Sequence, residues 1–491
     1  MTTAPTREPA ADRRGIDPEL RRLAIVVLLG TIMTILDTTI VNVAVTTLGK
    51  DFDASLSSIQ WVMTGYTLAL SMAIPLTGWS VRRFGARTMW LTSLVLFISG
   101  SLLCGLAWSV PALIAFRILQ GVGGGMLMPI GQTVLARAAG PDRMGRVMTV
   151  VSVPAMLAPV LGPLLGGVIL DSVSWRWLFF INIPFCALAL AAALRMMPRD
   201  TERDPGAPLD LVGMLLLSPG LAALVYGLAE TGKGAGLSNP RFLTGVVAGI
   251  MLVAAFVAHA LRKGAGALID VRLLRDRSFA AATGGLFVYC VPMFGLTVLL
   301  PLFSQVVRGE SPMDAGWLIS PLGLGAMITM TVAGRMTDRY GARWIATAGV
   351  ALVLAGTLVL TRIDPSTGHP TLMALILVIG LGHGAVSPVL MAAAYQGIPR
   401  ESVPAATTGA SILIRVGSSF GTAILTILLQ IMIRAEVPGA TGNLKDAVTH
   451  RTAQTPAQLT SAFTDTFWWA AALLAVTLVP VLLVPRRRGA A

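Results

Sequence analysis

Residues 23–46 read LAIVVLLGTIMTILDTTIVNVAVT, an apolar run with a single charged residue, Asp37. An α-helix rises about 1.5 Å per residue, so about 20 apolar residues cross the roughly 30 Å of hydrocarbon in a bilayer. A charge inside hydrocarbon costs several kcal/mol and is usually kept for transport or proton relay. The run therefore predicts a transmembrane helix that carries a functional acid near its middle.

Similar runs recur along the whole chain of 491 residues. The composition is 55% hydrophobic and 12% charged, whereas a soluble domain carries about 25% charged residues. Each run is continuous and lacks the alternation of barrel strands, which favours helices. The sequence therefore predicts an all-α polytopic membrane protein with about fourteen transmembrane helices. The predicted spans are 23–46, 57–78, 89–108, 111–136, 147–170, 177–196, 211–229, 243–261, 279–305, 313–334, 344–361, 371–394, 404–433 and 464–485.

The net charge of +13 raises the question of whether the chain binds nucleic acid. When the predicted spans alternate across a membrane, most of the 37 Lys and Arg residues fall on the side that holds both termini. This asymmetry follows the positive-inside rule, so both termini are predicted to be cytoplasmic. The charge therefore reflects topology, and no nucleic-acid partner is expected.

The sequence does not predict an enzyme. The loops are mostly short, so no soluble catalytic domain is expected. Residues 417–421 match the pattern G-x-S-x-G, but a nucleophile elbow needs a strand–turn–helix setting and a His partner. Cys104, Cys186 and Cys290 lie inside predicted spans without metal-ligand spacing. We therefore expect no catalytic residue, metal or cofactor, and the absence of a P-loop motif favours an ion gradient as the energy source.

Two copies of one short motif indicate that the chain is built from two related halves. Residues 78–87 read GWSVRRFGAR after the second predicted span, and residues 334–343 read GRMTDRYGAR after the tenth. Such internal repeats are typical of secondary transporters. The predicted organisation is a cytoplasmic tail at 1–22, a six-helix bundle at 23–198, a linker with two extra transmembrane helices at 199–275, a second six-helix bundle at 276–485 and a basic cytoplasmic tail at 486–491.

Five motifs together carry a family resemblance. Besides the repeated loop, they are LDTTIVNVA at 36–44, RILQGVG at 117–123, GPLLGG at 162–167 and WRW at 175–177 followed by Phe179, Asn182 and Pro184. With these motifs the chain resembles the major facilitator superfamily, and within it the fourteen-helix drug:proton antiporter branch of QacA/EmrB-like multidrug exporters. The resemblance covers residues 22–485. It implies a fold of two six-helix bundles plus two additional central helices.

The resemblance also implies a function and places residues in it. The expected activity is alternating-access export of lipophilic compounds, cationic ones among them, in exchange for protons. Asp37 is the expected protonation site and Arg117 its modulator, because a contact that forms and breaks between them would change proton affinity. The alternative is a permanent ion pair that only fixes helix packing.

Other motif residues are expected to control conformational change. The family has an acid where Arg82 stands, and this acid helps to hold helix ends together on the cytoplasmic side, a contact that we call the latch. The second copy keeps this acid as Asp338, so the latch is expected in the second half and is in doubt in the first. The conformational residues are Gly78, Arg83, Gly85, Arg87, Gly121, Gly162, Pro163, Gly166, Gly167, Gly334, Asp338, Arg339, Gly341 and Arg343.

A substrate cavity is expected from flexible Met, flat aromatic and isolated polar side chains within the spans. Packing or contact with lipid is the alternative for each, and a hydrogen-bonded packing role is the alternative for His383. The candidates are Asn42, Gln60, Trp61, Tyr66, Tyr289, Met293, Phe294, His383 and Arg415.

Two other functions fit the same sequence. One is an exporter of lipids or of an endogenous metabolite on the same fold, and the other is a membrane sensor or scaffold that transports nothing. The expected partners are small lipophilic substrates, protons and the lipid bilayer, with an envelope adaptor as a further candidate. The expected location is a bacterial cytoplasmic (inner) membrane.

Overall fold

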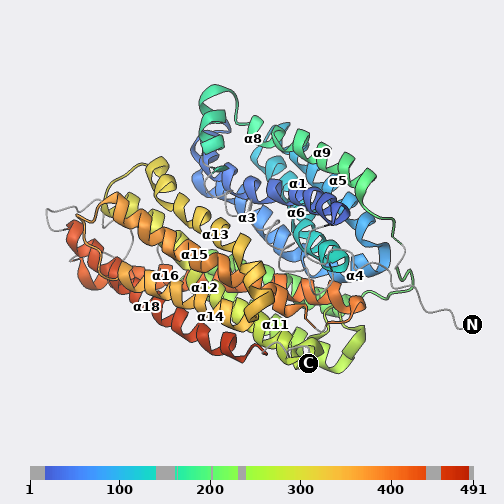
Figure 1. The fold of residues 1–491 in the computed structure, drawn as a ribbon. Coiled ribbons are helices and arrows are strands. Elements are labelled where there is room, and N and C mark those ends of the chain that lie inside the picture. The colour runs from blue at the N-terminus through green and yellow to red at the C-terminus, as the bar shows by residue number, and fades with distance from the viewer. Residues whose placement is uncertain are drawn as a thin grey trace, which may run out of the picture.

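The computed structural model describes residues 17–139, 161–162, 164–200, 203–230, 239–396, 398–437 and 455–485. In this part of the chain the regular elements are all helices, and the long ones run side by side in one bundle (Figure 1). Twelve of these helices are long and apolar enough to cross a membrane, or thirteen if one bent pair forms a single span. They match thirteen of the predicted spans; most of the remaining span, 147–170, lies outside the described residues, as do 1–16 and 486–491 of the tails.

The first group of helices forms the upper right part of Figure 1. Within it α6 packs against α3 and α5, while α1 packs against α6 and α9. The group comprises α1 (Pro18–Ile40), the short helix η1 (Val41–Ala44), α2 (Val45–Asp51), α3 (Leu56–Ala73), α4 (Leu76–Phe84), α5 (Ala86–Gly105), α6 (Val110–Ala139), α8 (Trp177–Phe180) and α9 (Asn182–Met196).

The second group forms the lower left part of the same view. Its main packing pairs are α13 with α15, α14 with α15, and α12 with both α16 and α18. The group comprises α12 (Arg277–Val307), α13 (Pro312–Tyr340), α14 (Ala342–Leu360), α15 (His369–Ala394), α16 (Val403–Glu436) and α18 (Thr455–Leu483).

Two further helices, α10 (Leu211–Ala229) and α11 (Pro240–Lys263), pack closely against each other. α10 also contacts α3 of the first group and α16 of the second, so the pair lies where the two groups meet. Only 11% of the apolar window of α11 is buried, which leaves most of that helix facing outward. The organisation as two bundles with two additional helices stays a prediction.

Two predicted spans are interrupted in the structure. The run at 57–78 consists of α3 and α4, which meet at an angle of 56° across Ile74 and Pro75. Proline lacks the backbone N–H that a continuing helix needs, so the break falls there. The run at 23–46 continues past α1 as η1, beginning at Val41.

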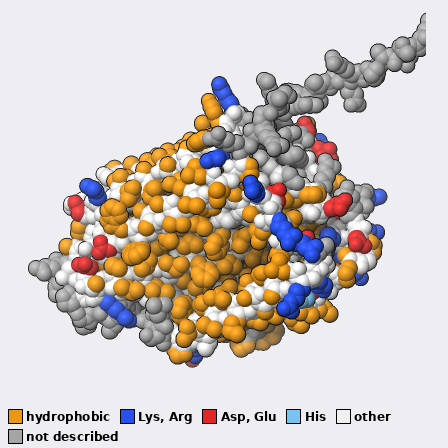
Figure 2. Space-filling view, turned by 90° about the horizontal axis from the view of Figure 1, so that it is seen from below, with side chains coloured by type: hydrophobic (Ala, Val, Ile, Leu, Met, Phe, Trp, Pro, Cys, Tyr) orange, Lys and Arg blue, Asp and Glu red, His pale blue; other side chains and the backbone are white. Residues whose placement is uncertain are grey.

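The surface has the pattern of a membrane protein. Figure 2 shows a broad belt of hydrophobic side chains, with Lys and Arg gathered mainly toward its margins. Many apolar side chains on the helices are exposed, among them Leu215, Met251 and Leu483, each more than 60% exposed. Contacts between the two groups include α4 against α16, where a Cβ added to Gly78 would lie 3.1 Å from Oγ1 of Thr408.

Candidate functional site

The charged pair predicted from the sequence is an ion pair inside the first helix group. Nη1 of Arg117, on α6, lies 2.6 Å from Oδ2 of Asp37, on α1. The Asp37 side chain is fully buried, and that of Arg117 is 1% exposed. At this distance and burial the two charges interact strongly, and removing either one would leave an uncompensated charge in the core.

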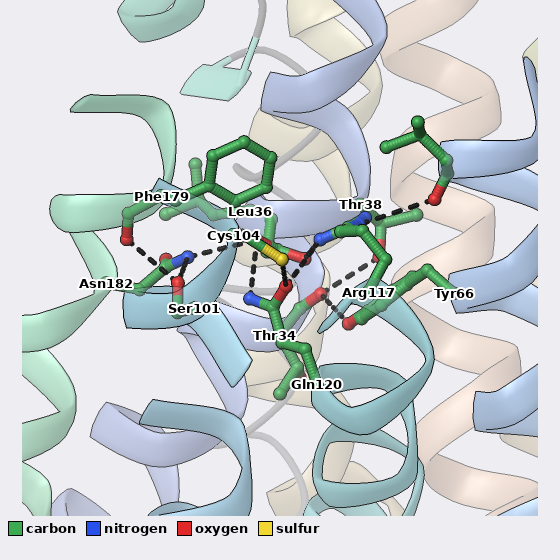
Figure 3. Close-up of polar contacts among 12 residues, drawn as sticks. Thr34, Leu36, Thr38, Tyr66, Ser101, Cys104, Arg117, Gln120, Phe179 and Asn182 are labelled. Carbon is green, nitrogen blue, oxygen red and sulfur yellow. Dashed lines mark hydrogen bonds and ion pairs between the residues drawn. The ribbon is translucent and has the colours of Figure 1, made fainter. Parts of the chain in front are cut away.

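Two side-chain amides complete the surroundings of the carboxylate. Nε2 of Gln120 and Nδ2 of Asn182 each donate to Oδ1 of Asp37 at 3.0 Å. Gln120 comes from α6 and Asn182 is the first residue of α9 (Figure 3). Donors from two helices therefore converge on Asp37, on a third helix. Both carboxylate oxygens are therefore occupied by donors.

The hydrogen bonds extend beyond Asp37. Asn182 Nδ2 also donates to Oγ of Ser101 at 3.0 Å, and Ser101 donates to the carbonyl of Phe179 at 2.8 Å. Gln120 Oε1 accepts from Nη1 of Arg117 at 2.8 Å. We call Asp37, Arg117, Gln120, Asn182 and Ser101 the acid cluster.

Aromatic rings surround the guanidinium of Arg117. Its Cζ lies 4.0 Å from the ring centroid of Tyr66 and 5.7 Å from that of Phe179. Nε of Arg117 donates to the carbonyl of Val62 at 3.4 Å. These contacts do not depend on the charge of Asp37, because ring faces and carbonyls attract a cation by themselves.

The glycine motifs bring other helices close to the acid cluster. A Cβ on Gly162 would lie 2.0 Å from Oγ1 of Thr39, so only glycine allows this segment to approach α1 two residues beyond Asp37. A Cβ on Gly121 would lie 2.6 Å from the carbonyl of Tyr66, whereas one on Gly167 would meet nothing within 4 Å. Gly166 also abuts α1, at Ile40. Pro163 lies outside the described residues.

The two copies of the loop motif share one backbone device. Gly85 has φ of +94° and Gly341 has φ of +84°, and each directly precedes a helix, α5 or α14. These positive φ values favour glycine, since side chains with a Cβ rarely adopt them. The shared geometry agrees with the internal repeat seen in the sequence.

The copies differ in their polar contacts. In the first, Asp200 from the segment after α9 accepts bonds from the backbone N–H groups of Arg87 and Thr88, both at 2.9 Å, and so caps α5. Arg83 donates to the carbonyl of Ala207 at 3.0 Å. An acid from another segment, Asp200, therefore lies at this motif, where the motif itself has Arg82.

In the second copy, the guanidinium of Arg339 lies 5.3 Å from the ring centroid of Tyr340, and that of Arg343 lies 5.6 Å from the ring of Trp344. The side chain of Asp338 lies outside the described residues, so its expected latch stays a prediction. Gly334 is buried on α13.

The predicted cavity residues are dispersed. Tyr66 contacts Arg117 of the acid cluster, whereas Tyr289 and His383 pair with each other in the second group, with the tyrosine hydroxyl 2.8 Å from Nδ1. Trp61 stacks on Tyr226 of α10 with ring centroids 5.8 Å apart. Of the remaining candidates, Met293 is buried, Phe294 is 39% exposed, Gln60 is partly buried, Arg415 contacts α3, and the side chain of Asn42 lies outside the described residues.

Three members of the acid cluster, Gln120, Asn182 and Ser101, received no role from the sequence. Gln120 lies three residues after Arg117 and therefore shares its helix face, a signal that could have identified it. Asn182 stood in a quoted motif, but its contact with Asp37 depends on the packing of α1 against α9, which no local pattern encodes.

Comparisons with known proteins identify the family of the chain. The family model described as "Major Facilitator Superfamily" matches residues 27–422 and 284–489. The "Multidrug resistance protein B homolog" of Mycobacterium tuberculosis (strain H37Rv) is 36% identical over 99% of this chain and 94% of its own length. The "Putative multidrug resistance protein MdtD" of Klebsiella pneumoniae is 32% identical over 82% of this chain and 85% of its own.

Solved structures support the fold. That of the "human organic anion transporter MFSD10 (TETRAN)" has a TM-score of 0.62 and 16% identity, and the match covers 93% of this chain and all of that one. At this identity the likeness concerns the fold alone.

Proposed function

The chain belongs to the Major Facilitator Superfamily, and from this premise we propose that it exports lipophilic compounds in exchange for protons. Asp37 is the protonation site in this proposal, and Arg117 responds to its charge. The names of the relatives, multidrug resistance proteins of bacteria, support export as the direction and drug-like compounds as the cargo. The location proposed with it is the bacterial cytoplasmic membrane.

The observation that carries the proposal is the buried Asp37–Arg117 pair. A charge buried this deeply is costly unless it is paired, so such residues within membrane helices usually serve transport or proton relay. The bond spans two helices, and Gln120 and Asn182 tie the same carboxylate to α6 and α9. A change in the charge of one carboxylate therefore reaches three helices.

The contacts suggest how a proton would act. When Asp37 is ionised, both of its oxygens accept bonds and hold α1, α6 and α9 together. Protonation cancels the negative charge, which weakens the bond from Arg117 and turns one oxygen into a donor that faces other donors. Arg117 keeps its contacts with Tyr66 and Val62, so the helices gain freedom to shift around α1 without exposing a bare cation.

The glycine segment provides a way to transmit the shift. Gly162 and Gly166 lie against Thr39 and Ile40, directly beyond Asp37 on α1. Movement of α1 relative to this segment would change the close approach that glycine permits. In alternating access, such a change tilts one helix group relative to the other.

The test uses the full chain in liposomes with an imposed proton gradient. Wild-type protein is expected to move an uncharged lipophilic dye only while the gradient exists, with matching proton movement reported by pyranine inside the liposomes. Asp37→Asn is expected to abolish gradient-driven transport, because it cannot lose a proton. Asp364→Asn, which changes an exposed loop acid, is the matched control and is expected to behave as wild type.

Gradient-driven transport by folded Asp37→Asn would contradict the proposal. Loss of transport in both variants would point to damage unrelated to Asp37.

A further inference from the structure

One arginine in the middle of α16 has no acidic partner. Nε of Arg415 donates to Oγ of Ser71 at 3.4 Å, and this is its only side-chain hydrogen bond within the described residues. Its side chain takes part in no ion pair there. Neither of its Nη nitrogens has a hydrogen-bond partner there, and neither is completely enclosed by other protein atoms. Arg415 is thus a cation within a membrane span whose terminal donors are free.

Helix geometry gives the direction of this side chain. A Cβ on Gly417 would lie 2.8 Å from the carbonyl of Phe287, and one on Gly421 would lie 2.0 Å from that of Val291, so this face of α16 is pressed against α12. Successive residues are about 100° apart around a helix, which places Arg415 on roughly the opposite face. Its bond to Ser71 of α3 confirms that it points across to the first helix group.

Two buried acids of the membrane helices, Asp37 and Glu230, have partners of their own. Asp37 is fully buried and accepts bonds from Arg117, Gln120 and Asn182. Glu230, after the end of α10, is 3% exposed and has partners of its own. The membrane interior at the meeting of the two groups therefore carries one positive charge without a counterion among the described residues.

We propose that Arg415 binds an anionic group, a carboxylate, sulfonate or phosphate, on an otherwise lipophilic cargo. The guanidinium offers a planar fork of donors that fits such groups, and its Nη donors are the ones left free. The low local dielectric strengthens attraction to an anion and repulsion of a cation. This inference rests on the proposed export function, and it replaces the cationic cargo allowed by the sequence with an anionic amphiphile.

Binding of matched probes tests the inference without requiring transport. The full chain is placed in nanodiscs of phosphatidylcholine and titrated with two radiolabelled hexylnaphthalenes, one carrying a sulfonate and the other a trimethylammonium group, with empty nanodiscs subtracted. Wild type is expected to bind the sulfonate at least about tenfold more tightly than the ammonium probe. Arg415→Gln is expected to remove that preference, and Arg415→Lys to keep part of it, because charge remains while the fork is lost.

Controls separate recognition from folding. Arg262→Gln, which changes an exposed basic residue near the end of α11, is expected to leave the sulfonate preference unchanged. If Arg415→Gln fails to fold, as judged by gel filtration, Arg415→Lys and Ser71→Ala provide the comparison. A wild-type preference for the ammonium probe, or an unchanged sulfonate preference in folded Arg415→Gln, would overturn the inference.

A further arm identifies the source of the anion. Replacing a third of the nanodisc lipid with phosphatidylglycerol should displace the sulfonate if the natural ligand is a lipid phosphate, and should leave its binding unchanged if the ligand is a free amphiphile. A result in which sulfonate binding depends on Arg415 while proton coupling fails would overturn the exporter proposal alone. Proton-driven transport without anion preference would overturn only this inference.

Discussion

Asp37 and Asp210 are both almost completely buried carboxylates with a basic partner, yet they are built differently. The Asp37 side chain is fully buried and is held by Arg117, Gln120 and Asn182, side chains from two other helices. Asp210 is 1% exposed and lies at the N-terminus of α10, where it accepts bonds from His259 and Lys263 of α11 and from backbone N–H groups of Gly213 and Leu268.

The two acids differ in the groups that donate hydrogen bonds to them. The partners of Asp210 all belong to residues 210–268, within and just after the α10–α11 pair, and two of them are backbone groups that cannot turn away. The partners of Asp37 are side chains on two other helices, α6 and α9. If Asp37 is the proton-coupling acid, as we propose, it differs from Asp210 in having only side-chain donors within the described residues, and these come from two other helices. We interpret Asp210 as an acid that holds α10 and α11 together, which we call the lock. We interpret Asp37 as the acid that gains and loses a proton, which we call the switch.

The largest contrast should appear in transport. Asp37→Leu combined with Arg117→Met replaces both charged side chains of the pair with apolar ones. Transport in proton-loaded liposomes is then expected to fall to the level of empty liposomes. Asp210→Asn is expected to keep gradient-driven transport per folded molecule, because Asp210 takes no part in proton exchange. Equal loss in the two variants, measured with folded protein, would remove the distinction between switch and lock.

Asp37 and Asp210 should also differ in how far a second substitution restores the folding stability that the first one removes. Asp37→Leu alone leaves Arg117 buried without an anion, which costs about 3–5 kcal/mol. Adding Arg117→Met should recover most of that loss, since apolar replacement of a whole buried pair is often neutral or stabilising. No second substitution on α11 should rescue Asp210→Leu, because the N–H of Leu268 would still lack its acceptor.

Unfolding in detergent, followed by tryptophan fluorescence during heating, gives the measurement. If Lys263→Met restored the thermal stability of Asp210→Leu as fully as Arg117→Met restores that of Asp37→Leu, the two sites would be equivalent.

The sequence predicted the main features of the fold because apolar runs and basic loops are local signals. It placed thirteen spans that the structure contains, and the family motifs that contain Asp37 and Arg117 paired these two residues. The bend at Pro75 was missed, because the apolar run continues across it although the proline was visible.

Contacts between distant residues could not be predicted in the same way. Arg415 and Ser71 are 344 positions apart, and Asp200 reaches Thr88 from 112 positions away. The sequence identified Arg82 as a departure from the family motif, but nothing local indicates that Asp200 returns to the same turn. Such pairs follow from how the helices pack, which hydrophobic periodicity leaves open.

The smallest predicted effect concerns acid pH and the lock at Asp210. Burial alone would raise the pKa of Asp210, but hydrogen bonds from Lys263, His259, Gly213 and Leu268 outweigh it and lower the pKa from 3.8 to about 2. A lowered pKa means that the folded state favours the ionised form, so the contribution to stability is complete above about pH 4 and is lost as the pH falls to about 2. A shift of this size corresponds to about 2 kcal/mol.

The thermal midpoint of wild type in a non-ionic detergent should therefore approach that of Asp210→Asn as the pH is lowered through this window. The difference between the two proteins is the quantity to follow, since the pKa of Glu310 is also lowered, by hydrogen bonds from Ser304 and Arg308 that outweigh its burial, and this group titrates in both. A difference that stays constant from pH 5 to pH 2 would mean that the ionised form of Asp210 contributes nothing, and the lock would then reside in packing between α10 and α11 instead.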